Sequence, residues 1–161
     1  MWVLLLAAIA LAEPPLDDVQ SVASYLVEDQ PCRWRVERLP ELRVGEQGVL
    51  SFRLNVPPDH HVYREALEIA VISSGGLTVG ETRYPAPVVV EDPDFGPQLE
   101  YRGDVVVEVP ITATTYTDAP VDLVVALRHQ GCSVEVCHPP REATEKVRVP
   151  VKLKPAAPQE R

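Results

Sequence analysis

Two segments near the C-terminus decide the fold: Val121-Asp122-Leu123-Val124-Val125-Ala126-Leu127-Arg128 and Lys146-Val147-Arg148-Val149-Pro150-Val151-Lys152-Leu153. The first is rich in branched apolar residues, and the second alternates charged with apolar side chains, which is typical of β-strands. Between them lies Gln130-Gly131-Cys132-Ser133-Val134-Glu135-Val136-Cys137-His138-Pro139-Pro140, which holds two of the three cysteines. The cysteine pair is therefore expected on a connection between strands.

Short apolar stretches separated by turn residues recur along the rest of the chain. The clearest spans residues 48–56, where Leu50, Phe52, Leu54 and Val56 alternate with other side chains. Further strands are expected over residues 32–37, 67–72, 77–79, 88–90 and 104–111. Seven or more short strands, with seventeen prolines and eight glycines to turn the chain, predict an all-β fold, an immunoglobulin-like antiparallel β-sandwich.

Two segments carry predictions about individual side chains. Alternation in residues 32–37 predicts that Trp34 and Val36 face a core. Cys32 lies on the same face of the expected strand. It is either a buried free thiol or an exposed thiol that pairs between molecules. In Asp92-Pro93-Asp94-Phe95-Gly96-Pro97 no strand is expected, so that the Phe95 ring should cover a neighbouring surface.

The sequence divides into four parts. Residues 1–12 are apolar and end in Ala10-Leu11-Ala12, which predicts a signal peptide whose true start can lie upstream, because no basic residue precedes the apolar run. Residues 13–44 are expected to form a lead-in with a short helix, followed by the first strand. Residues 45–154 form the predicted sandwich domain, and residues 155–161 a disordered tail.

Charge excludes one class of function. The net charge is −9, with 24 acids against 15 bases. Binding of a nucleic-acid backbone by a basic face is therefore not expected. The apolar N-terminal run is also shorter than the roughly 20 residues that cross a bilayer, so we expect a soluble mature chain.

The spacing of the cysteine pair permits a disulfide. Four residues separate Cys132 from Cys137, and a tight hairpin would place them on facing positions with Cβ atoms about 4.5 to 5.5 Å apart. A disulfide requires about 3.5 to 4.5 Å, which a small adjustment supplies. Because the enclosed loop is short, the bond gains little loop-closure entropy. A structural disulfide in an exported domain and a reversible redox pair both remain open.

A metal site is a further alternative. Two histidines flank the cysteine pair, so that His129, Cys132, Cys137 and His138 together supply imidazoles and thiolates, which suit zinc or copper(I). Strand geometry would send some of the four to opposite faces.

Upstream residues offer possible neighbours for the cysteines. His61 and Tyr63 are two positions apart and point to one face of a strand. Either they adjoin the cysteines, where an imidazole would titrate near neutral pH, or Tyr63 packs while His60 and His61 are solvated. The acids of the next segment are interpreted as a solvated loop surface that would disfavour a nearby thiolate: Glu91, Asp92, Asp94, Glu100 and Asp104.

Three motifs occur in a recognisable order: His61-Val62-Tyr63-Arg64, Glu91-Asp92-Pro93-Asp94-Phe95-Gly96 with Glu100-Tyr101-Arg102, and the segment from Gln130 to Glu142. Together they resemble the N-terminal periplasmic domain of DsbD-type thiol:disulfide interchange proteins over about residues 45 to 153. The resemblance implies the same immunoglobulin-like fold.

The resemblance also implies roles for individual residues. Cys137 is expected to form the mixed disulfide with partners, and Cys132 to resolve it. Phe95, flanked by Asp94, matches a loop phenylalanine that caps the cysteine pair, and Tyr63 matches an aromatic near it. His61 and His138 depart from the family, which commonly has aromatics there, and the loop between the cysteines is shorter than usual.

The resulting hypothesis is a periplasmic thiol-disulfide oxidoreductase module that passes reducing equivalents through Cys132 and Cys137, with no metal and no organic cofactor. By resemblance, its partners are periplasmic thioredoxin-like oxidoreductases and a membrane electron conduit supplied by separate chains. Two rival functions use the same features: a periplasmic copper or zinc carrier, and a structural sandwich module with a permanent disulfide.

Overall fold

Thirteen short strands and one turn of 3-10 helix make up the part of the chain that the computed structural model describes, residues 31–153. The predicted signal peptide, lead-in helix and C-terminal tail lie outside these residues. The elements are β1 (Arg33–Arg38), β2 (Leu42–Arg43), β3 (Gln47–Asn55), β4 (His60–Tyr63), η1 (Arg64–Ala66), β5 (Glu68–Ser73), β6 (Thr78–Val79), β7 (Val88–Asp92), β8 (Gly96–Tyr101), β9 (Asp104–Thr112), β10 (Val121–His129), β11 (Gly131–Ser133), β12 (Arg141–Val149) and β13 (Val151–Lys152).

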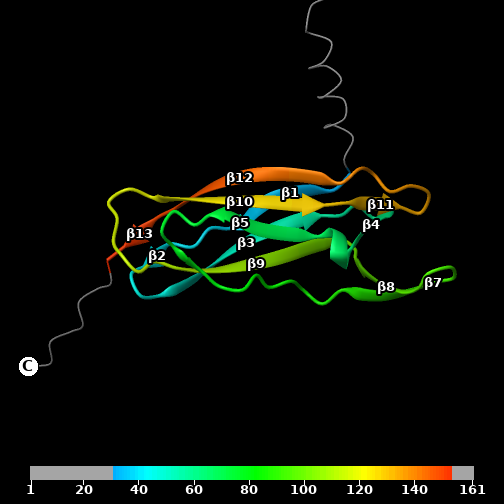
Figure 1. Cartoon of the computed structure of the whole chain (residues 1–161), viewed down its shortest axis with the longest axis horizontal. Helices are drawn as coiled ribbons and strands as arrows, with labels where there is room; N and C mark the ends of the chain where they lie inside the picture. Colours follow the sequence, from blue (N-terminus) through cyan, green and yellow to red (C-terminus); the bar gives the residue numbers. More distant parts are fainter. Residues whose placement is uncertain (1–30, 154–161) are drawn as a thin grey trace, which may run out of the picture.

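Two antiparallel sheets form the sandwich, as predicted. One has the strand order β1-β3-β9-β6 and the other β12-β10-β5. Alternate residues of β3, β9 and β10 point inward, and the fully buried side chains include Phe52, Val107 and Leu127. Figure 1 shows β10, β12 and β5 lying over β3 and β9, so that the core fills the space between the two layers.

A third, smaller sheet extends one end of the sandwich. Its order is β11-β4-β8-β7, and it joins the strand that carries Cys132 to the β7–β8 hairpin. In Figure 1 the labels β11 and β7 lie at one end of the long axis, whereas β2 and β13, which pair in parallel, lie at the other. The predicted redox residues are thus gathered at one end of the sandwich.

Some local predictions need correction. Trp34 and Val36 stand opposite Leu54 and Phe52 and share their inward face, but β1 is an edge strand and Val36 remains 41% exposed. Residues 92–97 were expected to contain no strand. Instead β7 ends at Asp92 and β8 begins at Gly96, because a turn of only three residues connects them.

No helix within residues 31–153 is long and apolar enough to cross a membrane.

Cys32 packs against β11, the strand that carries Cys132. It is a free thiol with no exposed surface, which settles the choice between a buried and an exposed thiol. A Cβ placed on Gly131 would lie 2.8 Å from Cys32 Sγ, so the thiol packs directly against the backbone of β11. Burial raises the pKa of Cys32 to about 11, because a thiolate is poorly solvated there.

His129 and Trp34 form the adjoining part of this buried layer. The Trp34 indole Nε1–H donates to His129 Nδ1 at 3.0 Å. His129 is 1% exposed, and burial, with a smaller contribution from the Arg141 charge, lowers its pKa to about 4. His129 is therefore a neutral hydrogen-bond acceptor in the core at neutral pH.

We expect Gly131→Ala to lower the free energy of unfolding by about 1 to 3 kcal/mol, the usual cost of an added methyl in a packed site. The new Cβ would collide with the Cys32 sulfur. Cys32→Ala removes that sulfur, so Gly131→Ala should cost clearly less in its background. Urea unfolding of the wild type, both single variants and the double variant measures the coupling. An equal cost in both backgrounds would contradict this packing.

We also expect the free energy of unfolding to fall at acid pH because of His129. The pKa of about 4 in the folded protein lies below the usual histidine value of 6.5, so the unfolded chain binds more protons between these two pH values. Stability is then fully present above about pH 6.5 and is lost as the pH falls to about 4, by on the order of 3 kcal/mol. In His129→Gln, which keeps an acceptor for Trp34 but does not titrate, urea unfolding should show a flatter pH dependence. Equal slopes in the two proteins would refute this assignment.

Candidate active site

Cys132 and Cys137 are joined by a disulfide across a tight hairpin, with an S–S distance of 2.03 Å and a Cα–Cα distance of 3.9 Å. Ser133 N–H donates to the Val136 carbonyl at 2.8 Å, and His138 N–H donates to the Gly131 carbonyl at 2.9 Å. The two cysteines therefore occupy facing positions, as the spacing predicted. Backbone hydrogen bonds on both sides of the pair hold the hairpin closed.

The two sulfurs differ in accessibility. Cys132 is 1% exposed, whereas Cys137 is exposed. The tip of the loop is apolar and open to solvent, with Val134 at 95% and Val136 at 56% exposure. A protein thiol or disulfide that approaches from solvent meets Cys137, while Cys132 is reached from within the domain.

Strand pairing brings His61 and Tyr63 to the buried cysteine. Cys132 stands directly opposite His61 in the β11–β4 pair, so their side chains leave the same face of the sheet. The rings of His61 and Tyr63 make an edge-to-face contact with centroids 4.9 Å apart. Burial and then the Glu100 charge raise the pKa of Tyr63.

Glu100 is a site residue that the sequence analysis placed wrongly. It was interpreted as part of a solvated surface but is 4% exposed. Arg102 donates to Glu100 Oε2 from Nε at 3.0 Å and from Nη2 at 2.8 Å. Glu100 Oε1 lies 3.9 Å from His61 Nε2. The available signal was the spacing, because an arginine two residues after Glu100 can reach back to neutralise its carboxylate.

Asp104 is exposed, as predicted, but lies on a strand instead of a loop. It begins β9 and accepts hydrogen bonds from Arg53 at 2.7 Å and from Asn55 at 2.8 Å. These hydrogen bonds lower the pKa of Asp104, and the one from Asn55 has the largest effect. Asp104 is thus part of a polar network on the sandwich surface.

Phe95 lies at the tip of the β7–β8 hairpin. Asp92 Oδ1 accepts the backbone N–H groups of Asp94 and Phe95, both at 2.9 Å, and Gly96 has a φ of +76° that closes the turn. The Phe95 ring is 81% exposed, and Asp94 is exposed beside it. The hairpin in this conformation presents the ring to solvent, at the same end of the molecule as the cysteine loop (Figure 1).

The four candidate metal ligands have different surroundings. His129 lines a cavity of about 160 Å³ together with Cys32 and Trp34. His138 stacks on His60 with ring centroids 5.8 Å apart, and the two cysteines are bonded to each other. Within residues 31–153 no three His, Cys, Asp or Glu side chains are placed to hold one metal ion.

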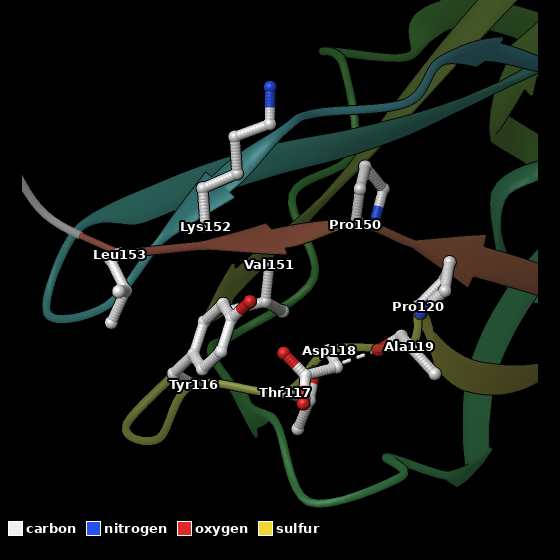
Figure 2. A pocket seen from close by; sticks show the side chains of 9 residues that line it. All are labelled: Tyr116, Thr117, Asp118, Ala119, Pro120, Pro150, Val151, Lys152 and Leu153. Carbon is white, nitrogen blue, oxygen red and sulfur yellow. Dashed lines mark hydrogen bonds between the residues drawn. The ribbon is translucent and has the colours of Figure 1, made fainter.

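A surface hollow of about 490 Å³ lies between the segments Tyr116–Pro120 and Pro150–Leu153 (Figure 2). Thr117 Oγ1 donates to the Ala119 carbonyl at 2.8 Å and so shapes one wall. The β13 residues that line the hollow lie at the end of the sandwich opposite to β11 (Figure 1). The hollow contains none of the predicted site residues.

Comparison with known proteins places these features in a family. The model of the family described as thiol:disulfide interchange protein DsbD, N-terminal, matches residues 36–149. No curated protein matches the chain. Among solved structures, the complex between the DsbD and PilB N-terminal domains of Neisseria meningitidis shares 21% identity with a TM-score of 0.50, covering 67% of this chain and 80% of that one.

Two further structures are more distant in shape. The reduced DsbD N-terminal domain of Neisseria meningitidis is 23% identical, with a TM-score of 0.48 and coverage of 68% of this chain and 83% of that one. A cohesin module of a Clostridium perfringens family 33 glycoside hydrolase is 12% identical, with a TM-score of 0.41 and coverage of 75% and 98%. The family model covers well over half of the sequence and includes all three motifs. The chain therefore belongs to the family of DsbD N-terminal domains.

Proposed function

We propose that this domain is a periplasmic thiol-disulfide oxidoreductase module in which Cys132 and Cys137 cycle between dithiol and disulfide. The observation that carries the proposal is the unequal exposure of a bonded pair, with Cys132 buried and Cys137 exposed, in a member of a thiol:disulfide interchange family. An exchange reaction needs one sulfur that a partner can reach and a second that is held close by. A bond that only stabilises the fold has no need for this asymmetry.

The proposed reaction has two steps. In the reduced domain, the Cys137 thiolate attacks a partner disulfide, which forms a mixed disulfide and releases one partner thiolate. The Cys132 sulfur then attacks Cys137 Sγ, which forms the Cys132–Cys137 bond and releases the second partner thiolate. Two electrons pass to the partner, the two protons of the dithiol end on the partner thiols, and each step is a thiol-disulfide exchange. The sulfurs themselves carry the electrons, so no metal or organic cofactor takes part.

We further propose that the partners are proteins. The relative from Neisseria meningitidis forms a complex with the PilB N-terminal domain. For this chain we propose a thioredoxin-like oxidoreductase as electron acceptor, and as donor a membrane electron conduit supplied by a separate chain. The open apolar tip at Val134 and Val136 offers contact area next to Cys137.

Phe95 is proposed as a cap that shields the cysteine pair between encounters. Its backbone is fixed by the hydrogen bonds to Asp92, while its ring is free of packing. Rotation of the hairpin toward the cysteine loop would cover the sulfurs with the ring and leave Asp94 in water, so no charge need be buried. His61 and Tyr63 would form the inner side of the same site.

The Cys132–Cys137 bond should behave as a reversible two-electron couple. Titration against dithiothreitol or glutathione buffers, with Cys32→Ser present to remove the third thiol, measures the reduction potential. We expect a value within the range of periplasmic oxidoreductases, roughly −120 to −300 mV. A potential far below about −300 mV would instead identify a permanent structural bond. Metal analysis of protein purified under reducing conditions tests the carrier alternative.

Removing the Phe95 ring should prevent the proposed cap from covering Cys137. In reduced protein carrying Cys32→Ser, Phe95→Ala is expected to speed alkylation of Cys137 by a small reagent by about fivefold or more, because reactivity follows access to the sulfur. Val89→Ala is the matched control, since Val89 is an exposed apolar residue of the same hairpin. Rates that agree in wild type and Phe95→Ala, with both proteins folded, would eliminate the cap.

A further inference from the structure

Four side chains form a cluster on one face of the small sheet: Cys132, His61, Tyr63 and Glu100. Cys132 stands opposite His61 across β11 and β4, and Tyr63 stands opposite Glu100 across β4 and β8. All four therefore project from the same side of the sheet. Arg102 completes the group through its two hydrogen bonds to Glu100. Arg102 thus binds Glu100, Glu100 faces His61, and His61 stands opposite Cys132.

Cys132 needs help to react because it is buried. Only the thiolate is an effective nucleophile, and burial disfavours that charged form. Cys132 is 1% exposed, so bulk water has little access to its proton. A base inside the domain would remove this proton at the moment when the sulfur attacks.

We propose that His61 is the general base and acid for Cys132, and that Glu100 and Arg102 are positioning residues that hold the imidazole in place. The inference rests on the proposed exchange function and assigns the proton step of that reaction. Glu100 Oε1 faces His61 Nε2 at 3.9 Å, which favours the ring tautomer with its proton on Nε2. Nδ1 is then the acceptor that can take the proton of Cys132.

The proton step is balanced as follows. The Cys132 Sγ–H proton moves to His61 Nδ1 while Sγ bonds to Cys137 Sγ and the bond from Cys137 to the partner breaks. The partner leaves as a thiolate and takes up a proton released from the imidazolium through solvent. During reduction of the domain, the proton lost by the attacking donor thiol reaches His61 through solvent, and the imidazolium gives it to Cys132 Sγ as the bond to Cys137 breaks. His61 ends each cycle neutral.

Glu100 is suited to support the charged intermediate. Its Oε2 is occupied by Arg102, and its Oε1 has no hydrogen bond from Arg102 and faces the imidazole. His61 Nε2 is itself buried without a hydrogen-bond partner. A proton on the ring therefore gains an ion pair with Glu100 at a site shielded from water, where such a pair is screened less. Without Glu100 the imidazolium would be a buried charge with no counter-ion.

The other histidines of the site are placed differently. His60 stands opposite Ser133 and so lies on the other face of the sheet. It stacks on His138. His60 is thus a matched control, because it is an imidazole one residue away on the same strand.

Other charged groups around His61 are few. Tyr63 lies on the same strand as His61, Glu100 on β8, Arg102 just past the end of β8, and Cys132 on β11. Asp92 of β7 and Glu65 of η1 add negative charge that acts on Tyr63. Of the charged groups in residues 31–153, Glu100 is the one that forms an ion-pair contact with the imidazole.

The test separates the two exchange steps in the full chain carrying Cys32→Ser. Reduced protein is mixed with dithionitrobenzoate, a disulfide whose leaving thiolate is coloured. The first thiolate is released by attack of Cys137, at a rate that scales with reagent concentration. The second is released when Cys132 attacks the mixed disulfide, at a rate independent of that concentration.

We expect His61→Phe and His61→Gln to slow the second release at pH 7 by about a hundredfold, within the usual range for general acid-base catalysis, and to leave the first release within about twofold. In wild type the second rate should rise with pH over roughly pH 5 to 8, where imidazoles titrate. In the His61 variants the rise should move to the range of an unassisted thiol, around pH 8.5 or higher. Glu100→Gln should lower the second rate several-fold and keep the imidazole-range rise. His60→Phe should change neither step.

The outcomes distinguish this inference from the function on which it rests. If wild type never releases the second thiolate, Cys132 does not resolve mixed disulfides and the proposed function fails. Suppose that the wild type releases the second thiolate, but the rate of this release rises with pH only around pH 8.5 or higher. His61 is then not the base, and the exchange function still holds. The same conclusion follows if His60→Phe slows that step as much as His61→Phe. The wild-type profile requires no variant, so it decides the question even if the His61 variants are unstable.

Discussion

The pairing of β11 with β4 is the constraint on which the cysteine end of the domain depends. It consists of three residue pairs, Gly131 with Val62, Cys132 with His61 and Ser133 with His60. Val62 has no exposed surface and is fixed in the core, so His61 must project from the opposite face, beside Cys132. A slip by one residue would turn every side chain over. The hydrophobic core therefore determines which residue meets the buried sulfur.

The base of the cysteine hairpin is held more firmly than its tip. Cys32 packs against Gly131, and Gln130 donates its side-chain amide to the His138 carbonyl at 2.9 Å. Beyond these contacts the loop is fastened mainly by Ser133, whose hydroxyl accepts the Val136 N–H at 3.1 Å. Cys132 belongs to the packed base and Cys137 to the solvated side. The difference in exposure between the two sulfurs thus follows from how the hairpin is anchored.

The sequence was sufficient for properties that depend on local alternation. The strands at residues 48–56, 104–111 and 121–128 appear close to their predicted positions, since period-two patterns report a half-buried sheet directly. The facing cysteines also follow from their spacing. Two errors concern where a strand lies within its sheet, which the pattern does not encode. Val36 faces the core side but sits on an edge strand, and Glu100 is buried because β8 lies between β4 and β7.

Comparison of the two buried cysteines indicates why Cys132 would need its neighbours in the proposed reaction. Cys32 and Cys132 have almost the same exposure, 0% and 1%. For Cys32, burial alone raises the thiol pKa to about 11, and a thiol in that state has almost no thiolate at neutral pH. A resolving cysteine given only the same burial would be equally inert and would leave mixed disulfides intact. What differs is the facing strand, which offers Cys132 an imidazole backed by a carboxylate. In the proposed exchange, burial would protect the Cys132 sulfur from stray reagents, and His61 on the facing strand would act as the base that allows this sulfur to react with Cys137.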